Sequence, residues 1–187
     1  MDDVNMKKLN FAYAAVVMAI AFGQQAMASD GTINFTGKVT DVTCTVTATS
    51  SSGSNVTLPT VSKTALANIH DTAGATPFKI SLTGCTGSLA DPVNVAVYFE
   101  PGGNVNTDGR LNNTAVAGAA QNVDIALSLA DKVSEELNLG VSPTVKYATI
   151  DPDDKNAEMN FVAKYYATGA AEAGAVTSSV TYSIVYP

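Results

Sequence analysis

The sequence contains no tryptophan, a single histidine and only two cysteines among its 187 residues. Because aromatic stacking on tryptophan is a common way to bind sugars, its absence weakens the case for a carbohydrate-binding face. His70 stands in a polar stretch without a serine elbow or a paired cysteine nearby, so we interpret it as a surface residue and not as a triad member. We therefore expect no catalytic residues and no enzymatic activity.

Charged residues are also scarce, and negative charge prevails. They make up 14% of the chain, and the net charge is −7. A net negative chain offers no electrostatic basis for binding nucleic acid. Asp151, Asp153 and Asp154 are carboxylates of the kind that calcium prefers, but their spacing is not that of an EF-hand loop, and Pro152 indicates an ordinary solvated turn. We expect no bound metal, no cofactor and no small-molecule substrate.

Long apolar runs are limited to the N-terminus, where Phe11 to Phe22 form an unbroken run. This run is too short for a membrane span, which needs about 20 apolar residues. Two lysines precede it, and Ala26-Met27-Ala28 supplies a small-x-small cleavage site. The pattern predicts a cleaved secretory signal peptide over residues 1–28. Met6 begins a cleaner signal than Met1, so both start positions remain open.

The mature chain, residues 29–187, keeps both cysteines, Cys44 and Cys85. In an exported chain an even pair of cysteines is typical of a disulfide. Closing a loop of about 40 residues stabilises the fold by roughly 4 kcal/mol in the chain-entropy model. The alternative is two free thiols that serve a metal or a reaction, but no partner ligands stand nearby in the sequence. We therefore predict a Cys44–Cys85 disulfide.

The mature chain is a succession of short segments in which apolar and polar residues alternate, with turn residues between them. The segments expected as strands are Thr43–Thr47, Val56–Pro59, Pro77–Cys85, Val93–Phe99, Val123–Leu129, Met159–Tyr166 and a last one from Val176. Ala48–Asn55 is expected to be a loop, and only Asp131–Leu139 has a helical composition, over a length that also suits a turn. Seven or eight strands at irregular spacing predict one all-β domain, a sandwich with Greek-key connections.

The last fourteen residues carry the clearest alternation. From Val176 the even positions read Val, Ser, Val, Tyr, Ile, Tyr, whereas the odd positions are mostly hydroxyl residues. A period of two with β-branched and aromatic residues predicts a half-buried strand. Nothing in the sequence blunts the edge of this strand, so we expect it to pair with another chain. Ile33, Phe35 and Val39 alternate in the same way near the mature N-terminus.

Three stretches together resemble the major-subunit pilins of bacterial chaperone–usher fimbriae, the type 1 fimbrial family. Residues 31–39, followed five residues later by Cys44, resemble the N-terminal extension and first strand of that family. Residues 161–170 resemble its penultimate strand and turn. The C-terminus is the most specific part, with Gly174 fourteenth from the end, alternating apolar residues after it, and Tyr186 as the penultimate residue.

This resemblance implies an incomplete immunoglobulin-like Greek-key β-sandwich, which lacks its last strand and is completed by a donated strand. Residues 29–40 would form the donor extension, which leads into the first strand, and residues 41–187 the pilin domain. The donor residues implied are Gly31, Ile33 and Phe35. The residues implied for the groove strand, which binds the chaperone and the next subunit, are Gly174, Val176, Val180, Tyr182, Ile184 and Tyr186.

The resemblance also implies a function. The chain would be a structural subunit of a bacterial surface fimbria that is exported through the periplasm and supports cell adhesion. Its partners would be identical or related pilin subunits in a filament, a periplasmic chaperone and an outer-membrane usher. Two alternatives remain open: a minor adaptor or tip subunit of the same fibre, and a free secreted carbohydrate-binding β-sandwich.

Overall fold

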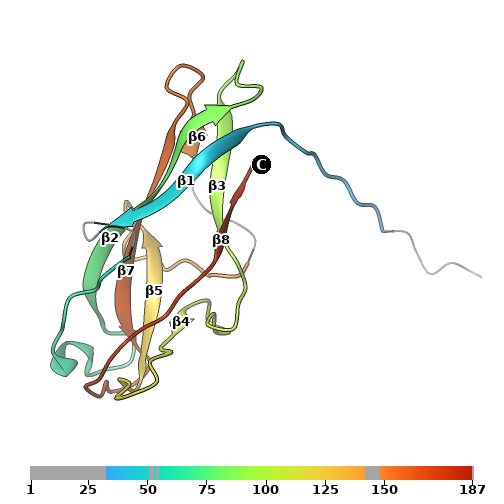
Figure 1. Ribbon diagram of the computed structural model, residues 1–187. Helices are drawn as coiled ribbons and strands as arrows, with labels where there is room; N and C mark the ends of the chain where they lie inside the picture. The colour runs from blue at the N-terminus through green and yellow to red at the C-terminus, as the bar shows by residue number, and fades with distance from the viewer. Residues whose placement is uncertain (1–32, 51–52, 54, 142–147, 187) are drawn as a thin grey trace, which may run out of the picture. The chain divides into compact units, whose positions relative to one another are not determined.

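The computed structural model describes residues 33–50, 53, 55–141 and 148–186 (Figure 1). The predicted signal peptide and Gly31 lie outside these residues. The chain divides into two units, Met1–Lys38 and Val39–Pro187, and each is considered by itself. In the first unit, residues 33–38 form no regular strand, although their alternation predicts one. A strand requires a neighbour to pair with, and the described part of this unit contains none.

The second unit is an all-β domain. Its described residues form the strands β1 (Thr43–Ser50), β2 (Thr72–Thr86), β3 (Val93–Phe99), β4 (Leu111–Asn112), β5 (Val123–Leu129), β6 (Ala148–Ile150), β7 (Ala157–Ala167) and β8 (Tyr182–Val185), and one short 3-10 helix, η1 (Lys63–Leu66). The bounds of β3 and β5 coincide with the predicted ones. No helix in the described part of the chain has the length and apolar character needed to cross a bilayer.

The strands form two antiparallel sheets (Figure 1). The larger sheet has the order β1-β2-β7-β5-β4, and the smaller one has the order β6-β3-β8. Side chains from both sheets share one core, in which Leu82, Val95, Ile150 and Phe161 are at most 1% exposed. The ring of Phe161 stands edge-on to that of Phe99, with centroids 5.4 Å apart, and joins the two layers.

The predicted disulfide between Cys44 and Cys85 is present and links β1 to β2. Cys85 is fully buried in the core. The cross-link therefore fixes the edge strand β1 onto the neighbouring strand close to where the domain begins. The disulfide closes a large loop, as the sequence led us to expect, because the two cysteines are separated by 41 residues.

Three local predictions need correction. The loop expected from Ala48 was wrong over its first three residues, because β1 continues to Ser50 by pairing with Phe78–Ile80 of β2. Val56–Pro59 is not a strand; Val56 and Leu58 pack on the core without pairing in a sheet. The strand expected from Val176 begins only at Tyr182. Asp131–Leu139, for which a turn remained an alternative, consists of turns and one isolated bridge.

Candidate functional site: an open groove beside the last strand

The smaller sheet ends at β8, which pairs with a single strand. Tyr182 to Val185 pair with Phe99 to Ala96 of β3, and no other strand in the described residues pairs with β8. The other edge of β8 therefore carries main-chain donors and acceptors that pair with no strand of the described chain. Such an edge is able to bind an additional strand.

A groove lies beside this edge, and we call it the terminal groove. It has a volume of about 620 Å³. It is lined by residues 55–58, by residues 176–180 with Tyr182, and by side chains of the sandwich, namely Ala48, Phe78, Ile80, Phe99, Leu111, Ile125, Leu127, Ala163 and Tyr165. Protein interiors contain few voids larger than a water molecule. A space of this size between the sheets means that the sandwich lacks one element of its core.

The burial of side chains alternates along the C-terminal segment beside the groove, as its sequence pattern predicted. Val176, Val180 and Tyr182 are half-buried and line the groove, whereas the threonines and serine at 177, 179 and 181 are exposed. Ile184 and Tyr186 also pack on the core, but they do not line the groove. The part that each residue plays in binding a partner stays a prediction.

Gly174 lies where two backbone segments approach each other closely. A Cβ atom at this position would stand 2.3 Å from the backbone nitrogen of Ala120 and 2.5 Å from the carbonyl oxygen of Gly118. The contact is held by hydrogen bonds from Ala175 N to Gly118 O (2.7 Å) and from Ala120 N to Ala175 O (2.9 Å). Any side chain at 174 would separate these segments and displace the start of the groove-lining segment.

A second, smaller cavity adjoins the start of the terminal groove. It has a volume of about 400 Å³ and shares Tyr165 and Val176 with the groove. Residues 171–175, Leu66 and Val123 also line it. Burial raises the pKa of Tyr165, which stands between the two spaces, because ionisation would place a charge in partly apolar surroundings. The open apolar region thus extends beyond the groove toward Gly174.

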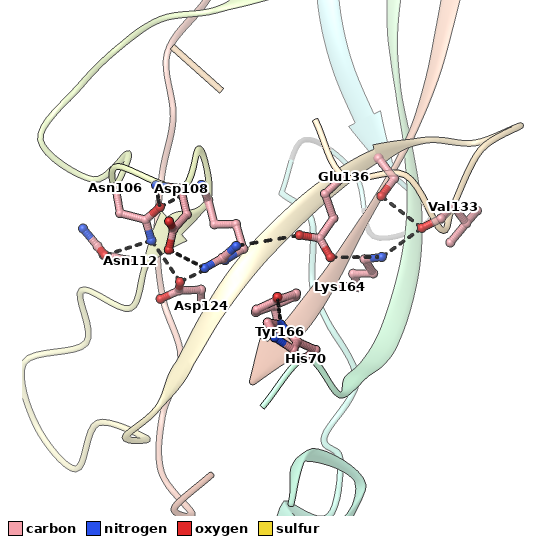
Figure 2. Close-up of polar contacts among 11 residues, drawn as sticks. His70, Asn106, Asp108, Asn112, Asp124, Val133, Glu136, Lys164 and Tyr166 are labelled. Atoms are coloured by element: carbon pink, nitrogen blue, oxygen red, sulfur yellow. Dashed lines mark hydrogen bonds and ion pairs between the residues drawn. The ribbon is translucent and has the colours of Figure 1, made fainter. Parts of the chain in front are cut away.

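A network of charged residues on the larger sheet was missed by the sequence reading (Figure 2). Lys164 is only 4% exposed; its Nζ donates to the carbonyl of Val133 (2.9 Å) and lies 3.7 Å from a Glu136 carboxylate oxygen. The Arg110 guanidinium lies 3.2 Å from Asp124 and 4.1 Å from the centroid of the Tyr166 ring.

His70 contacts this network from its exposed end. Its Nδ1 is hydrogen-bonded to the hydroxyl of Tyr166 (Figure 2). The residue itself is exposed, in line with the prediction of a surface histidine. In the described chain, no cluster of three or more His, Cys, Asp or Glu side chains has the arrangement of a metal site. The sequence offered no signal for the network, because its members come from separate segments that only the fold assembles.

Comparisons with known proteins identify the family. The model of the type-1 fimbrial protein family, FimA, matches residues 58–187. The chain belongs to this family. It is 44% identical to the F17 fimbrial protein of Escherichia coli, over 97% of this chain and 99% of that protein. It is 45% identical to the major fimbrial subunit SMF-1 of Stenotrophomonas maltophilia, over 86% of this chain and 95% of that protein.

Solved structures agree on the fold of this fimbrial protein. The crystal structure of the P pilus rod subunit PapA superposes with a TM-score of 0.51 at 18% identity, and the match covers 77% of this chain and 99% of that one. The predicted incomplete immunoglobulin-like sandwich is therefore confirmed. The chain is a structural subunit of a surface fimbria, as the resemblance implied.

Proposed function

We propose that this fimbrial subunit polymerises by donor-strand exchange, in which residues 29–40 of one copy fill the terminal groove of the next copy. The observation that carries the proposal is the 620 Å³ groove beside an unpaired strand edge. The matching occupant is the alternating segment that contains Ile33 and Phe35, whose side chains are 78% and 89% exposed. An apolar side chain of this size gains most by entering an unfilled core.

The energetics of such a contact are favourable. Full burial of Ile33 and Phe35 would contribute about 1.5–3 kcal/mol for each side chain. The main-chain hydrogen bonds of an added strand supply further affinity, and its alternate side chains fill the pockets. Because donor and groove belong to different surfaces of one chain, the contact is heterologous and generates an open filament.

An unassembled subunit would expose the same groove and the same edge, which promotes aggregation. We therefore infer that a periplasmic chaperone covers the groove with a strand of its own until an outer-membrane usher passes the subunit into the fibre. In this proposal the chain has no catalytic role, and it supports cell adhesion as part of the fibre. The assignment to a fimbria leaves the choice between a rod subunit and a minor adaptor or tip subunit to experiment.

The test uses the mature chain with Ile33→Asp and Phe35→Asp, which disables its own donor segment, and a synthetic peptide of residues 29–43. We expect the unmodified mature chain to form oligomers in gel filtration, whereas the disabled chain stays monomeric. The peptide should raise the denaturant midpoint of the disabled chain strongly. Polymerisation by strand exchange is ruled out if the disabled chain assembles like the unmodified one and ignores the peptide.

Two peptides with the same added charge provide the matched control. An Ile33→Asp peptide places a carboxylate on the face that enters the groove, whereas an Asn34→Asp peptide places it on the opposite face of the same strand. We expect the first peptide to lose its effect and the second to keep most of it. Equal behaviour of the two peptides would mean that binding does not depend on alternate side chains.

A further inference from the structure

The segment that lines the terminal groove is held in an unusual way. Regular strand pairing begins only at Tyr182, although the alternating pattern starts at Val176. Among the described contacts, the main chain of residues 176–181 receives hydrogen bonds from two backbone N–H groups: Thr114 donates to Thr177 O (2.7 Å) and Glu100 donates to Thr181 O (2.9 Å). Side chains of the two connections that flank β4 make the other contacts.

Asn113 makes the largest share of them. Its Oδ1 accepts hydrogen bonds from the backbone N–H groups of Thr177 (3.0 Å) and Ala115 (3.1 Å). Its Nδ2 donates to the carbonyl oxygens of Ala175 (2.9 Å) and Ala120 (3.0 Å). A side-chain amide has two donor hydrogens and an acceptor oxygen with two lone pairs. All four hydrogen-bonding positions of the Asn113 amide are thus occupied. The side chain makes the contacts that a neighbouring strand would otherwise make with the main chain of this segment.

Asn104 adds a second contact of the same kind. Its Nδ2 donates to the carbonyl oxygen (3.0 Å) and the hydroxyl (3.1 Å) of Ser179. The main chain at 175, 177 and 179 is therefore held from one side. In an extended segment, successive residues direct their main-chain groups to opposite sides. The main-chain groups of the intervening residues, Val176 and Ser178, then face away from the asparagines, toward the edge that remains open.

We propose that Asn113 is a positioning residue of the terminal groove, which keeps residues 175–177 extended before the donor strand arrives. The inference rests on the function proposed above. Without this amide the segment has to be ordered during docking, and the entropy of ordering then lowers the affinity for the incoming strand. Asn113 does not line the groove itself, so its effect is exerted through the main chain of Ala175 and Thr177.

Asn106, which lies in the connection before β4, is a matched control for Asn113 in the connection after it. Its Oδ1 accepts hydrogen bonds from the backbone N–H groups of Asp108 (3.1 Å) and Arg110 (3.0 Å), and its Nδ2 donates to Asp124 (2.9 Å). Both asparagines therefore brace a backbone with their amide groups. Asn106 braces a turn in the charged network (Figure 2) and makes none of its contacts with the groove-lining segment.

The experiment compares Asn113→Ala with Asn106→Ala, each in the mature chain that carries Ile33→Asp and Phe35→Asp. The dissociation constant of a fluorescent peptide of residues 29–43 is measured by anisotropy. We expect Asn113→Ala to weaken peptide binding by roughly tenfold, in line with the loss of two hydrogen bonds to the segment. Asn106→Ala should change binding by less than about twofold, although it also removes hydrogen bonds.

Amide hydrogen exchange supplies a readout that a general loss of stability would not reproduce. Exchange at Thr177 should accelerate in Asn113→Ala relative to the strands of the larger sheet, and bound peptide should slow it again. If Asn113→Ala folds poorly, Asn113→Gln serves instead, because it keeps the amide group but its extra methylene displaces the hydrogen bonds to Ala175 and Thr177. An intermediate loss of affinity is then expected.

The outcomes separate the two proposals. If the reference chain binds the peptide and Asn113→Ala binds it equally well, the role of Asn113 is refuted while strand exchange stands. Equal weakening by the Asn113 and Asn106 variants also refutes it, since that result reflects stability alone. If the reference chain itself fails to bind the peptide, strand exchange is refuted, and the positioning role is refuted with it.

Discussion

The two faces of the larger sheet are completed to different degrees. On the face that carries Lys164 and Tyr166, the connection after β5 covers the strands, and each buried charge has a partner. On the face that carries Ala163 and Tyr165, a groove of about 620 Å³ stays open between the sheets. The larger sheet thus has one face that is covered through polar contacts and another face beside an unfilled apolar groove. The contrast shows that the two faces of the sheet differ in how far other segments cover them.

The largest expected effect concerns the closed face. Lys164→Ala removes the buried ammonium group that contacts Glu136 and the Val133 carbonyl, which among the described residues keep only Arg110 (3.9 Å) and the Ser128 hydroxyl (3.1 Å), and it leaves a void under the connection. Removing one member of a buried charge pair costs on the order of 3 kcal/mol. We expect denaturant unfolding of the peptide-bound chain to show a loss of this size, with the peptide affinity nearly unchanged.

Lys164→Met is the control for this prediction, since it restores the volume without the charge. It should recover part of the lost stability. A loss of peptide binding in Lys164→Ala without a loss of stability would contradict the separation of the two faces.

On the face that lines the groove, a larger side chain should raise the stability of the empty chain. Ala163→Leu places three more carbon atoms into the groove, where Ala163 is part of the lining. Each buried methylene contributes about 0.8 kcal/mol, so the empty chain should gain up to ~2 kcal/mol. The added side chain occupies the space of the donor, and peptide binding should therefore weaken sharply. Both quantities are obtained from denaturant melts with and without the peptide.

The same substitution at a closed position supplies the comparison. Ala126 is a fully buried alanine of β5 and is absent from the groove lining. Ala126→Leu should destabilise the chain by overpacking, typically by about 1–3 kcal/mol. If Ala163→Leu also destabilises the empty chain, the groove is less open than its volume indicates.

A smaller effect is expected at Ser178, which is the polar member of the apolar series that begins at Val176. Its Oγ is buried without a hydrogen-bond partner in the described structure. Since an unsatisfied buried hydroxyl costs about 1–3 kcal/mol, Ser178→Ala should raise the stability of the empty chain by about 1 kcal/mol. Thermal melting of the disabled chain measures this gain. An unchanged or lower midpoint would mean that the hydroxyl already has a partner.

The smallest effect concerns the exposed pair Lys79–Glu158 on the larger sheet, whose charged atoms are 2.6 Å apart. The hydrogen bond from Lys79 lowers the pKa of Glu158. A lowered folded-state pKa gives a contribution that is present above the unfolded pKa and is lost as pH falls through the folded pKa. Stability measured from pH 6 downward should therefore decline slightly less in Glu158→Gln than in the parent chain. A steeper decline in the variant would contradict the direction of the shift.

Much of the fold was predictable because the information is local. β3 and β5 occupy their predicted bounds, since alternating β-branched residues between turn signals define a strand without reference to its neighbours. The disulfide was predictable from two cysteines in an exported chain. The half-buried alternation from Val176 was also correct as a pattern of side chains.

Other features could not be predicted, because they depend on contacts between distant residues. β1 extends through Ser50 because β2 offers a partner there, although the sequence at that point is typical of a loop. Asp124 and Ser128 alternate with apolar residues in β5, a pattern typical of a solvated outer face, yet both are buried. A segment that covers a sheet leaves no periodic signal in the strand beneath it.

The sequence by itself determined an all-β chain with one cross-link, an alternating C-terminal segment and an alternating N-terminal segment, because side-chain period, cysteine number and turn residues are properties of short stretches. Only the tertiary structure decided that the space beside the last strand stays open. It also decided that Asn113, 64 residues before Thr177, holds that segment in place. A groove and its supports are made by residues from several strands, so they exist only once the sheets have packed.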